Sequence, residues 1–412
     1  MFEFDDLPSQ DHQVIDEAFV DDAAKARDPA FDEKLYEVPL GEDFISSSLT
    51  TKTTFGLKKV TSEDFEILKL LGRGAYGKVM LCRHKESNQL YAMKVLKKAS
   101  LFVHAKNAEH TKAERQILEE VRHPFIVQLF YAFQTNDRLY LILEYATGGE
   151  LFTHMASGKQ TSSRKKVSFF KEHMFLEDVA RFYLAELLLA IEHLHGLGIV
   201  YRDLKPENCL LDGEGHVLLT DFGLSKVSIE GSRTNTVCGT AEYMAPEILL
   251  EVNYDKSVDF WTFGILMYEM LIGYTPFRSN NKKKTLDAIL KKKLQIPYYI
   301  SADAKDLLIR LLRKDPNTRL GSEKDGIQKI KSHRFFRKIN WKELSERTAT
   351  PPIKPIVTDP ILAENFDEQF TNELIKDSPI DAPNLDDKMK DYFLNFSYVA
   401  QSRHLLNAFE DK

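Results

Sequence analysis

A dense group of polar and charged residues separates two apolar runs in the stretch IVYRDLKPENCLLD, which covers residues 199–212. The members of the group fall within seven residues and are Arg202, Asp203, Lys205, Glu207 and Asn208. A core strand cannot bury so many polar side chains unless each finds a partner. We therefore expect a loop that leaves the core at this point and carries chemistry.

The order of the hydrophobic patterns predicts two lobes of different construction. Strand patterns run from Phe65 to about Val95, a helix is expected from about Glu109 to Val121, and a further strand covers residues 139–146. After Gly149 the patterns become helical, and residues 179–198 predict a long buried helix that ends at its glycines. Strands first and helices later favour an α+β fold over an alternating parallel sheet.

Composition and charge limit the class of protein. The 412 residues contain no apolar run of 18 or more and no signal pattern, so we expect a soluble protein with no membrane span. Three widely spaced cysteines fit a reducing, cytoplasmic setting. The net charge of -6 argues against direct nucleic-acid binding. Residues 1–45 hold 14 acidic and 3 basic residues, which predicts a poorly ordered acidic head.

Three glycines, Gly72, Gly74 and Gly77, lie between two strand patterns in LGRGAYGKVML. Such a turn lets backbone N–H groups approach phosphates closely, although an ordinary glycine-rich hairpin has the same sequence pattern. Lys94 follows in YAMKVLKK, where apolar neighbours place it within a strand near the core. A lysine there can neutralise phosphate if a carboxylate holds it, and Glu114 at the edge of the helical apolar stripe is the candidate.

The acidic residues farther along the chain complete a set suited to phosphoryl transfer. Asp221 ends an apolar strand in LLTDFGLSK and can bind Mg²⁺, which prefers oxygen ligands and bridges to phosphates. In the loop at 199–212, Asp203 can accept the proton of an attacking hydroxyl, Asn208 can hold a second metal ion and Lys205 can steady the transferred group. Each residue alone has an ordinary explanation, but their order and context agree with one function.

These motifs, together with AEYMAPE at 241–247, resemble those of the protein kinases, and within them the AGC group, in which Tyr201 also replaces the commoner histidine. Lys205 is typical of serine/threonine specificity. Residues 110–145 and 339–355 are most similar to the ribosomal-protein (S-six) kinases. The resemblance implies a bilobal α+β kinase fold, with an N-terminal extension at 1–64, a kinase domain at 65–336 and an AGC tail at 337–412.

The resemblance also assigns residues to ATP. Glu144 and Ala146 follow the gatekeeper Leu143 and would present backbone groups to adenine, while Glu150 is counted with the nucleotide site. The side chains that would enclose the ring are Val79, Ala92 and Leu210. A stack anchored by Asp259 would contain Leu118, Leu129, Tyr201 and Phe222, and a structural ion pair is expected between Glu247 and Arg319.

Substrate recognition is expected to rest on carboxylates. Glu150, Glu207 and Glu269 resemble the acidic positions that bind basic residues upstream of the acceptor, with arginine favoured for its bidentate geometry. Val237, Ala241 and Met244 would line an apolar seat for the residue after the acceptor. The implied substrates are proteins with such basic motifs, among them a protein of the small ribosomal subunit, and the kinase is expected to act as a monomer.

Three phosphorylation sites are implied by the resemblance. Thr236 in the activation loop would be modified by a phosphoinositide-dependent kinase, with Arg202, Lys226 and His110 as receptors of its phosphate. Ser378 resembles the turn-motif site. Ser397 follows the aromatic anchors Phe393 and Phe396 and would be modified by a TOR complex, while Asn365–Asp367 would cross the nucleotide site.

Two segments keep open interpretations. FEFDDL at 2–7 either recruits the TOR complex or is an inert acidic tail, because its aliphatic residue comes one position late. The insertion at 156–173 predicts a mobile loop, with a nuclear-import or anion-binding patch at 164–166 and self-phosphorylation at Ser168 as alternatives. For the whole chain, an Akt-like kinase and a pseudokinase scaffold are the rival interpretations.

Overall fold

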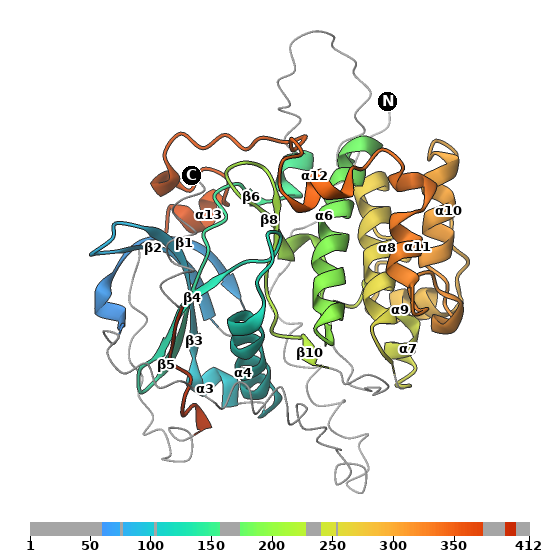
Figure 1. The fold of residues 1–412 in the computed structure, drawn as a ribbon. Helices are drawn as coiled ribbons and strands as arrows, with labels where there is room; N and C mark the ends of the chain where they lie inside the picture. The colour runs from blue at the N-terminus through green and yellow to red at the C-terminus, as the bar shows by residue number, and fades with distance from the viewer. Residues whose placement is uncertain are drawn as a thin grey trace, which may run out of the picture. The chain divides into compact units, whose positions relative to one another are not determined.

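The computed structural model describes residues 60–400 apart from 75–76, 103–104, 157–173, 228–239, 253 and 374–391. Its N-terminal part is a six-stranded antiparallel sheet with the order β1-β2-β3-β5-β4-β11 (Figure 1). The strands are β1 Phe65–Gly74, β2 Gly77–His84, β3 Leu90–Lys97, β4 Leu129–Gln134, β5 Arg138–Leu143 and β11 Tyr398–Val399.

The two faces of this sheet bury different residues. In β3, Tyr91, Met93 and Val95 point into an aromatic-rich cluster that also contains Phe65 and Phe133. The alternate residues Ala92 and Lys94 point to the opposite face, because side chains alternate along a strand. That face is covered by α3 Lys98–Phe102 and α4 Ala105–Glu120, whose apolar residues join the main core.

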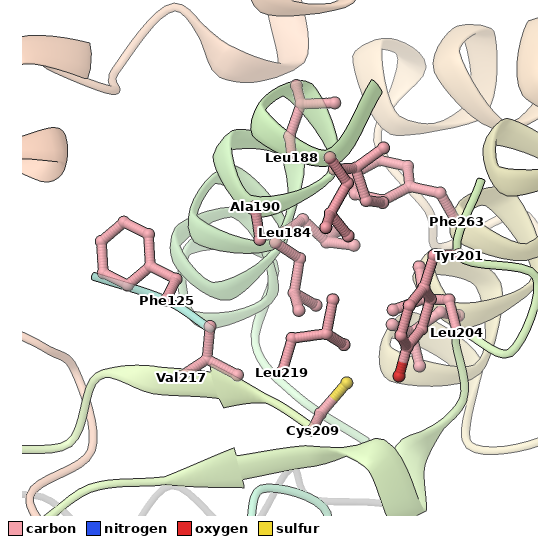
Figure 2. Close-up of a cluster of buried hydrophobic side chains, with 14 of the residues drawn as sticks. Phe125, Leu184, Leu188, Ala190, Tyr201, Leu204, Cys209, Val217, Leu219 and Phe263 are labelled. Carbon is pink, nitrogen blue, oxygen red and sulfur yellow. The ribbon is translucent and has the colours of Figure 1, made fainter. Parts of the chain in front are cut away.

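The C-terminal part is built around two buried helices, α6 Glu177–Gly196 and α8 Ser257–Ile272 (Figure 1). Every residue of α8 except Glu269 is buried, which is expected of a helix surrounded by protein on all sides. The α6 side chains Leu184 and Leu188 pack with Phe125, Leu219 and Phe263 in the core (Figure 2). No described helix is long and apolar enough to cross a membrane.

Two small sheets hold the polar loop of residues 202–208 against this core. The strand β7 Ile199–Val200 pairs with β10 Lys226–Val227, and β6 Gly149–Glu150, β8 Cys209–Leu211 and β9 Val217–Leu219 form the other sheet. The apolar runs on both sides of the loop are therefore strands, and the loop between them is fixed at both ends.

Shorter elements complete the described chain. The remaining helices are α5 Thr153–Ala156, α7 Pro246–Leu249, α9 Lys282–Lys291, α10 Ala302–Leu311, α11 Gly326–Lys331, α12 Trp341–Ser345 and α13 Glu368–Thr371. Single 3-10 turns are η2 Ser62–Asp64, η3 Pro206–Asn208, η4 Pro316–Thr318, η5 Arg334–Phe336 and η6 Pro360–Leu362.

The predicted helix at Glu109–Val121 is present but begins four residues earlier, at Ala105. Its first turn contains no acidic residue, so the sequence lacks a common signal for a helix start. The long helix predicted at 179–198 is α6, which begins at Glu177 and ends at Gly196. The expected strand at Phe65 is confirmed as the start of β1.

Candidate active site

Lys94 lies at the centre of a charged triad on the α4-covered face of the sheet. Its Nζ donates to Glu114 Oε1 at 2.6 Å and to Asp221 Oδ1 at 3.2 Å. Glu114 is 3 % exposed, on the inner side of α4, whereas the Asp221 side chain is 45 % exposed. The predicted contact between Lys94 and Glu114 is therefore confirmed, and the carboxylate next to them opens toward solvent.

The three charges shift one another's proton affinities. Burial acts to lower the pKa of Lys94, but the carboxylates of Asp221 and Glu114 outweigh it and hold that pKa above its usual value. The Lys94 ammonium in turn lowers the pKa of Asp221. Lys94 is thus a fixed cation and Asp221 a fixed anion at neutral pH, as binding of phosphate and of a metal ion requires.

Two non-glycine residues of the site adopt the left-handed backbone conformation. Arg202 has φ 68° and Asp221 has φ 60°. Asp259 supports the first of these, because its carboxylate accepts from the backbone N–H of Tyr201 at 2.9 Å and of Arg202 at 2.7 Å. Strained backbone that the surrounding structure enforces is commonly found at functional sites.

Asp203 lies in the polar loop, 6 % exposed, with two side-chain partners. Lys205 Nζ donates to Asp203 Oδ2 at 2.6 Å, and Asn208 Nδ2 donates to the same oxygen at 3.0 Å. Burial raises the pKa of Asp203 above its usual value in spite of these donors. A carboxylate of raised proton affinity is better suited to accept a proton from a substrate hydroxyl.

The donor set fits Mg²⁺. Asn208 uses its Nδ2 to bond both the carbonyl and the carboxylate of Asp203, at 2.8 Å and 3.0 Å. This orientation directs the amide oxygen away from Asp203 and makes it available as a ligand. Together with the Asp221 carboxylate it supplies the hard oxygen atoms that Mg²⁺ prefers.

The three glycines of the turn between β1 and β2 differ in what requires them. A Cβ at Gly72 or Gly74 would meet nothing within 4 Å, so these positions leave the open space that a phosphate chain needs. A Cβ at Gly77 would lie 1.9 Å from the Val95 carbonyl oxygen. Gly77 is thus required by the close approach of β2 to β3. The sequence had predicted instead that all three glycines serve the approach of the backbone to phosphates.

The residues assigned to adenine lie around the triad. Val79 pairs with Lys94 across β2 and β3, and Ala92 pairs with the gatekeeper Leu143 across β3 and β5. The Glu144 N–H donates to Gln128 O at 2.9 Å and the Ala146 carbonyl accepts from the Gly149 N–H at 3.1 Å. We therefore expect the Glu144 carbonyl and the Ala146 N–H to face the base. Leu210 is half-buried in β8.

The three proposed substrate carboxylates lie close enough to influence one another. Burial raises the pKa of Glu150, and the charges of Glu207 and of Asp367 in the tail raise it further. Burial likewise raises the pKa of Glu269, with Glu207 adding to the effect while a hydrogen bond from Tyr243 opposes it. A cationic side chain placed among these groups would relieve the repulsion.

Two further predicted arrangements are present. Leu118 and Leu129 are buried in the same core cluster as Tyr201 and Phe222, whose ring centroids lie 5.2 Å apart. Glu247 Oε1 and Oε2 accept from Arg319 at 2.5 Å and 2.8 Å, and both side chains are almost fully buried. The structure thus brings together the residues of both predictions.

The predicted phosphorylation sites fall in different parts of the chain. Thr236, Ser378, Ser168 and Val237 lie outside the described residues, as do residues 2–7 and most of the insertion at 156–173. Ser397 is exposed, while the anchors Phe393 and Phe396 are buried in the main core. In the tail, Asn365 Nδ2 donates to Thr147 O at 3.1 Å, which places that segment beside the residue directly after Ala146, one of the residues assigned to adenine.

Several residues of the site were not predicted from the sequence. Tyr243 donates to Glu269, and Thr275 donates to Glu242, so hydroxyl groups orient carboxylates of the acidic region. Asp367 adds a tail carboxylate near Glu150. The position of Tyr243 inside the motif AEYMAPE was a signal that could have pointed to this residue. The contacts themselves join segments that are distant in sequence, and no sequence signal predicts them.

Comparison with known proteins decides the family. The protein kinase domain matches residues 65–336, and the protein kinase C terminal domain matches residues 357–398. The chain belongs to the protein kinase family. The C-terminal match confirms the predicted AGC group, and the fold agrees with a kinase that has a sheet-based N-lobe and a helical C-lobe.

Curated relatives of this kinase are ribosomal protein S6 kinases. It is 47 % identical to ribosomal protein S6 kinase beta of Caenorhabditis elegans over 84 % of the chain, and 48 % identical to ribosomal protein S6 kinase alpha-2 of Mus musculus over 84 %. Identity to ribosomal protein S6 kinase alpha-3 of Homo sapiens is 45 % over 89 % of the chain. The kinase covers 60 %, 45 % and 49 % of these relatives' lengths. The predicted resemblance to this branch is confirmed.

Proposed function

We propose that this chain is an ATP- and Mg²⁺-dependent serine/threonine kinase that acts on proteins. The observation that carries the proposal is the convergence of two groups of residues. Lys94 contacts Asp221, Asn208 contacts Asp203, and the Asp221 charge contributes to the raised pKa of Asp203, so the groups adjoin one another. A pseudokinase scaffold would not need all four side chains in this arrangement.

Each residue then has a defined step. Lys94 binds the phosphate oxygens of the nucleotide while Glu114 holds its ammonium in place. Asp203 accepts the proton of the substrate hydroxyl as its oxygen attacks the terminal phosphorus and the bond to the departing ADP breaks. Lys205 neutralises charge on the transferred group. A magnesium ion held by Asp221 and Asn208 would neutralise the phosphates.

The substrate class follows from the acidic region. Glu150, Glu207 and Glu269 would pair with arginine or lysine upstream of the acceptor, where a cation relieves the repulsion that raises the pKa of Glu150 and Glu269. The relatives are named for ribosomal protein S6, which supports a ribosomal protein as one substrate. We place the kinase in the cytoplasm, with access to the nucleus.

Regulation completes the proposal. Phosphorylation of Thr236 by a phosphoinositide-dependent kinase and of Ser397 by a TOR complex would activate the enzyme. The Ser397 site is supported by its exposed position directly after two buried aromatic anchors. A phosphate adds roughly -1.5 to -2 charge, which can order a loop or a helix through cationic partners. Thr236→Ala is expected to lower turnover at least about tenfold, an increase in barrier of about 1.4 kcal/mol.

A peptide array with the purified, Thr236-phosphorylated kinase tests activity and preference together. Peptides with arginine upstream of serine should be phosphorylated, and replacing the arginines with alanine should lower kcat/KM. The double variant Glu207→Gln with Glu269→Gln should lose this preference while it still phosphorylates a non-basic peptide at the original rate. Absence of phosphate transfer to every peptide would favour a scaffold.

A further inference from the structure

A cluster of six exposed lysines and three exposed tyrosines covers helix α9 and the segments on either side of it. We call it the lysine–tyrosine surface, and its members are Lys282, Lys283, Lys284, Lys291, Lys292, Lys293, Tyr274, Tyr298 and Tyr299. All six lysines are exposed. Residues 278–300 contain seven basic residues and one acidic residue, although the whole chain carries a net charge of -6. The surface is therefore a local reversal of the overall charge.

The lysines have little structural reason to be there. Lys282, Lys283 and Lys284 form the first turn of α9, which holds no acidic residue. Cations are unfavourable at this end of a helix because the macrodipole is positive there. Within the described chain only Lys291 of the six has a side-chain ion pair, to Asp287 at 3.3 Å, and that pair is highly exposed. A local rule broken without structural compensation indicates a functional site.

The tyrosines are equally unusual. Tyr274, Tyr298 and Tyr299 are 46 %, 99 % and 44 % exposed, and they are the only aromatic side chains among the described residues that reach this level of exposure. The ring centroid of Tyr274 lies 6.1 Å from that of Tyr268, and the centroids of Tyr298 and Tyr299 lie 5.8 Å apart. The exposed rings of the described chain are thus gathered in one place.

One hydrogen bond joins the lysine-rich segment to buried Tyr268, whose ring contacts that of Tyr274. The Tyr268 hydroxyl donates to Gln295 O at 2.9 Å, two residues after Lys293. Lys314 Nζ donates to Lys292 O at 2.7 Å and fixes the same segment to the residues that follow α10. Helix α9 separates the two groups of three lysines by about 15 Å, at 1.5 Å per residue. The Lys291–Lys293 group therefore lies in the segment that contacts Tyr268, and the Lys282–Lys284 group lies one helix length away.

We propose that the lysine–tyrosine surface binds single-stranded RNA. A single strand supplies regularly spaced phosphates for the lysines and flat bases that stack on exposed rings. An acidic protein segment would pair with the lysines but would give the fully exposed Tyr298 ring no comparable partner. The inference rests on the proposed function, because a ribosomal protein phosphorylated within its ribosome would reach the kinase beside RNA. It departs from the expectation of no direct nucleic-acid contact, which rested on the net charge of the whole chain.

Binding of a fluorescent oligouridine of about 12 nucleotides tests the proposal. We expect the affinity to fall steeply between about 50 and about 200 mM potassium chloride. The triple variant Lys282→Gln, Lys283→Gln, Lys284→Gln should bind at least about tenfold more weakly. The plot of log affinity against log salt concentration should also become less steep by about 2, because each lost phosphate contact on a single strand contributes about 0.7 to that slope. Tyr298→Ala should weaken binding by about 5-fold to about 150-fold, the range for loss of one stacked base.

Matched control variants distinguish binding at this surface from a general effect of the protein's positively charged side chains. The triple variant Lys324→Gln, Lys342→Gln, Lys354→Gln makes the same charge change at exposed positions elsewhere and should bind RNA as the parent does. Tyr298→Phe keeps the ring and should also bind normally. Equal affinity of the Lys282–Lys284 variant and the parent, or equally strong binding of oligoglutamate by the parent, overturns the proposal. Phosphorylation of a short free peptide should be unchanged in every variant, so loss of RNA binding is distinguishable from failure of the kinase assignment.

Discussion

Two buried ion pairs of this kinase are built in opposite ways. Glu247 and Arg319 are almost fully buried, and the guanidinium also donates to Ser257 O at 2.9 Å, so the pair is closed on all sides. In the Lys94–Glu114 pair, Glu114 is just as buried. Asp221, which also contacts Lys94, has a half-exposed side chain and a left-handed backbone conformation. A closed pair can only hold structure, whereas an open one next to strained backbone can bind a ligand. The difference separates a charge cluster that holds structure from one suited to the proposed binding of a nucleotide.

The largest effect should come from the open site. Asp203→Asn removes the proposed proton acceptor and should lower kcat by about 10²-fold to about 10⁴-fold, because this is the usual contribution of a general base. Nucleotide affinity should change little, since the Asp203 carboxylate acts on the substrate hydroxyl. Steady-state peptide phosphorylation and a fluorescent nucleotide titration measure the two quantities. Full peptide phosphorylation by the variant would remove Asp203 from its role.

Removing one partner of the closed Glu247–Arg319 pair should lower the stability of the protein. Arg319→Ala leaves the Glu247 carboxylate buried without its cation, and we expect the free energy of unfolding to fall by about 3 to 5 kcal/mol. Urea denaturation measures this change. The matched control is Arg310→Ala, whose partner Asp306 forms an exposed pair at 2.9 Å and should cost no more than about 1 kcal/mol. Equal losses in the two variants would contradict the comparison.

The variant Glu114→Gln tests whether the open Lys94–Glu114 pair affects activity more than stability. The variant keeps the side-chain shape but removes the charge that holds Lys94, a hydrogen bond worth about 1.5 to 3 kcal/mol. We expect kcat/KM to fall about tenfold to about 150-fold, with a much smaller change in stability than for Arg319→Ala. Glu109→Gln, at an exposed position of the same helix, should be neutral.

The pH profile should show the raised pKa of Asp203. In its proposed role the residue acts in its deprotonated form, and burial raises its folded pKa above the usual 3.8. The rate should therefore fall about tenfold per pH unit once the pH drops below that raised value. A plot of log kcat/KM against pH locates this limb, and Asp203→Asn should lack it. An acid limb at or below the usual pKa of an aspartate would argue against the buried state of Asp203.

The smallest effect is expected at the far end of α4. Arg122 Nη1 donates to the carbonyls of Leu118 and Val121 at 2.8 Å and 2.7 Å, and its Nη2 donates to the Tyr398 hydroxyl at 2.8 Å. Tyr398→Phe should destabilise the kinase by about 0.5 to 1.5 kcal/mol, the net value of one hydrogen bond. Differential scanning calorimetry detects this, with Tyr392→Phe as a control in the same tail. A stability gain would contradict the assigned contact.

Local sequence patterns predicted which elements carry the site residues, but not the backbone conformation and the tertiary contacts that hold these residues in place. Lys94, Glu114, Asp203 and Asp221 were placed in their elements from alternation, helical periodicity and strand ends, and the Lys94–Glu114 contact is present. The left-handed backbone at Arg202 and Asp221 and the carboxylate support from Asp259 depend on tertiary packing, which no local pattern encodes. The pairing of β11 with β4 was also missed, because a two-residue strand is too short to show alternation.

The position of β11 has a consequence for how the protein is made. The Gln134 side chain bonds Phe393 O across 259 residues of sequence, and Tyr398 pairs with Ala132 of β4. Until the tail has been synthesised, β4 is an unprotected sheet border with free N–H and C=O groups that a strand from another chain can join. The nascent N-lobe therefore faces a period of aggregation risk that ends only when its own tail arrives, and we infer that chaperone demand during synthesis is greatest in that interval.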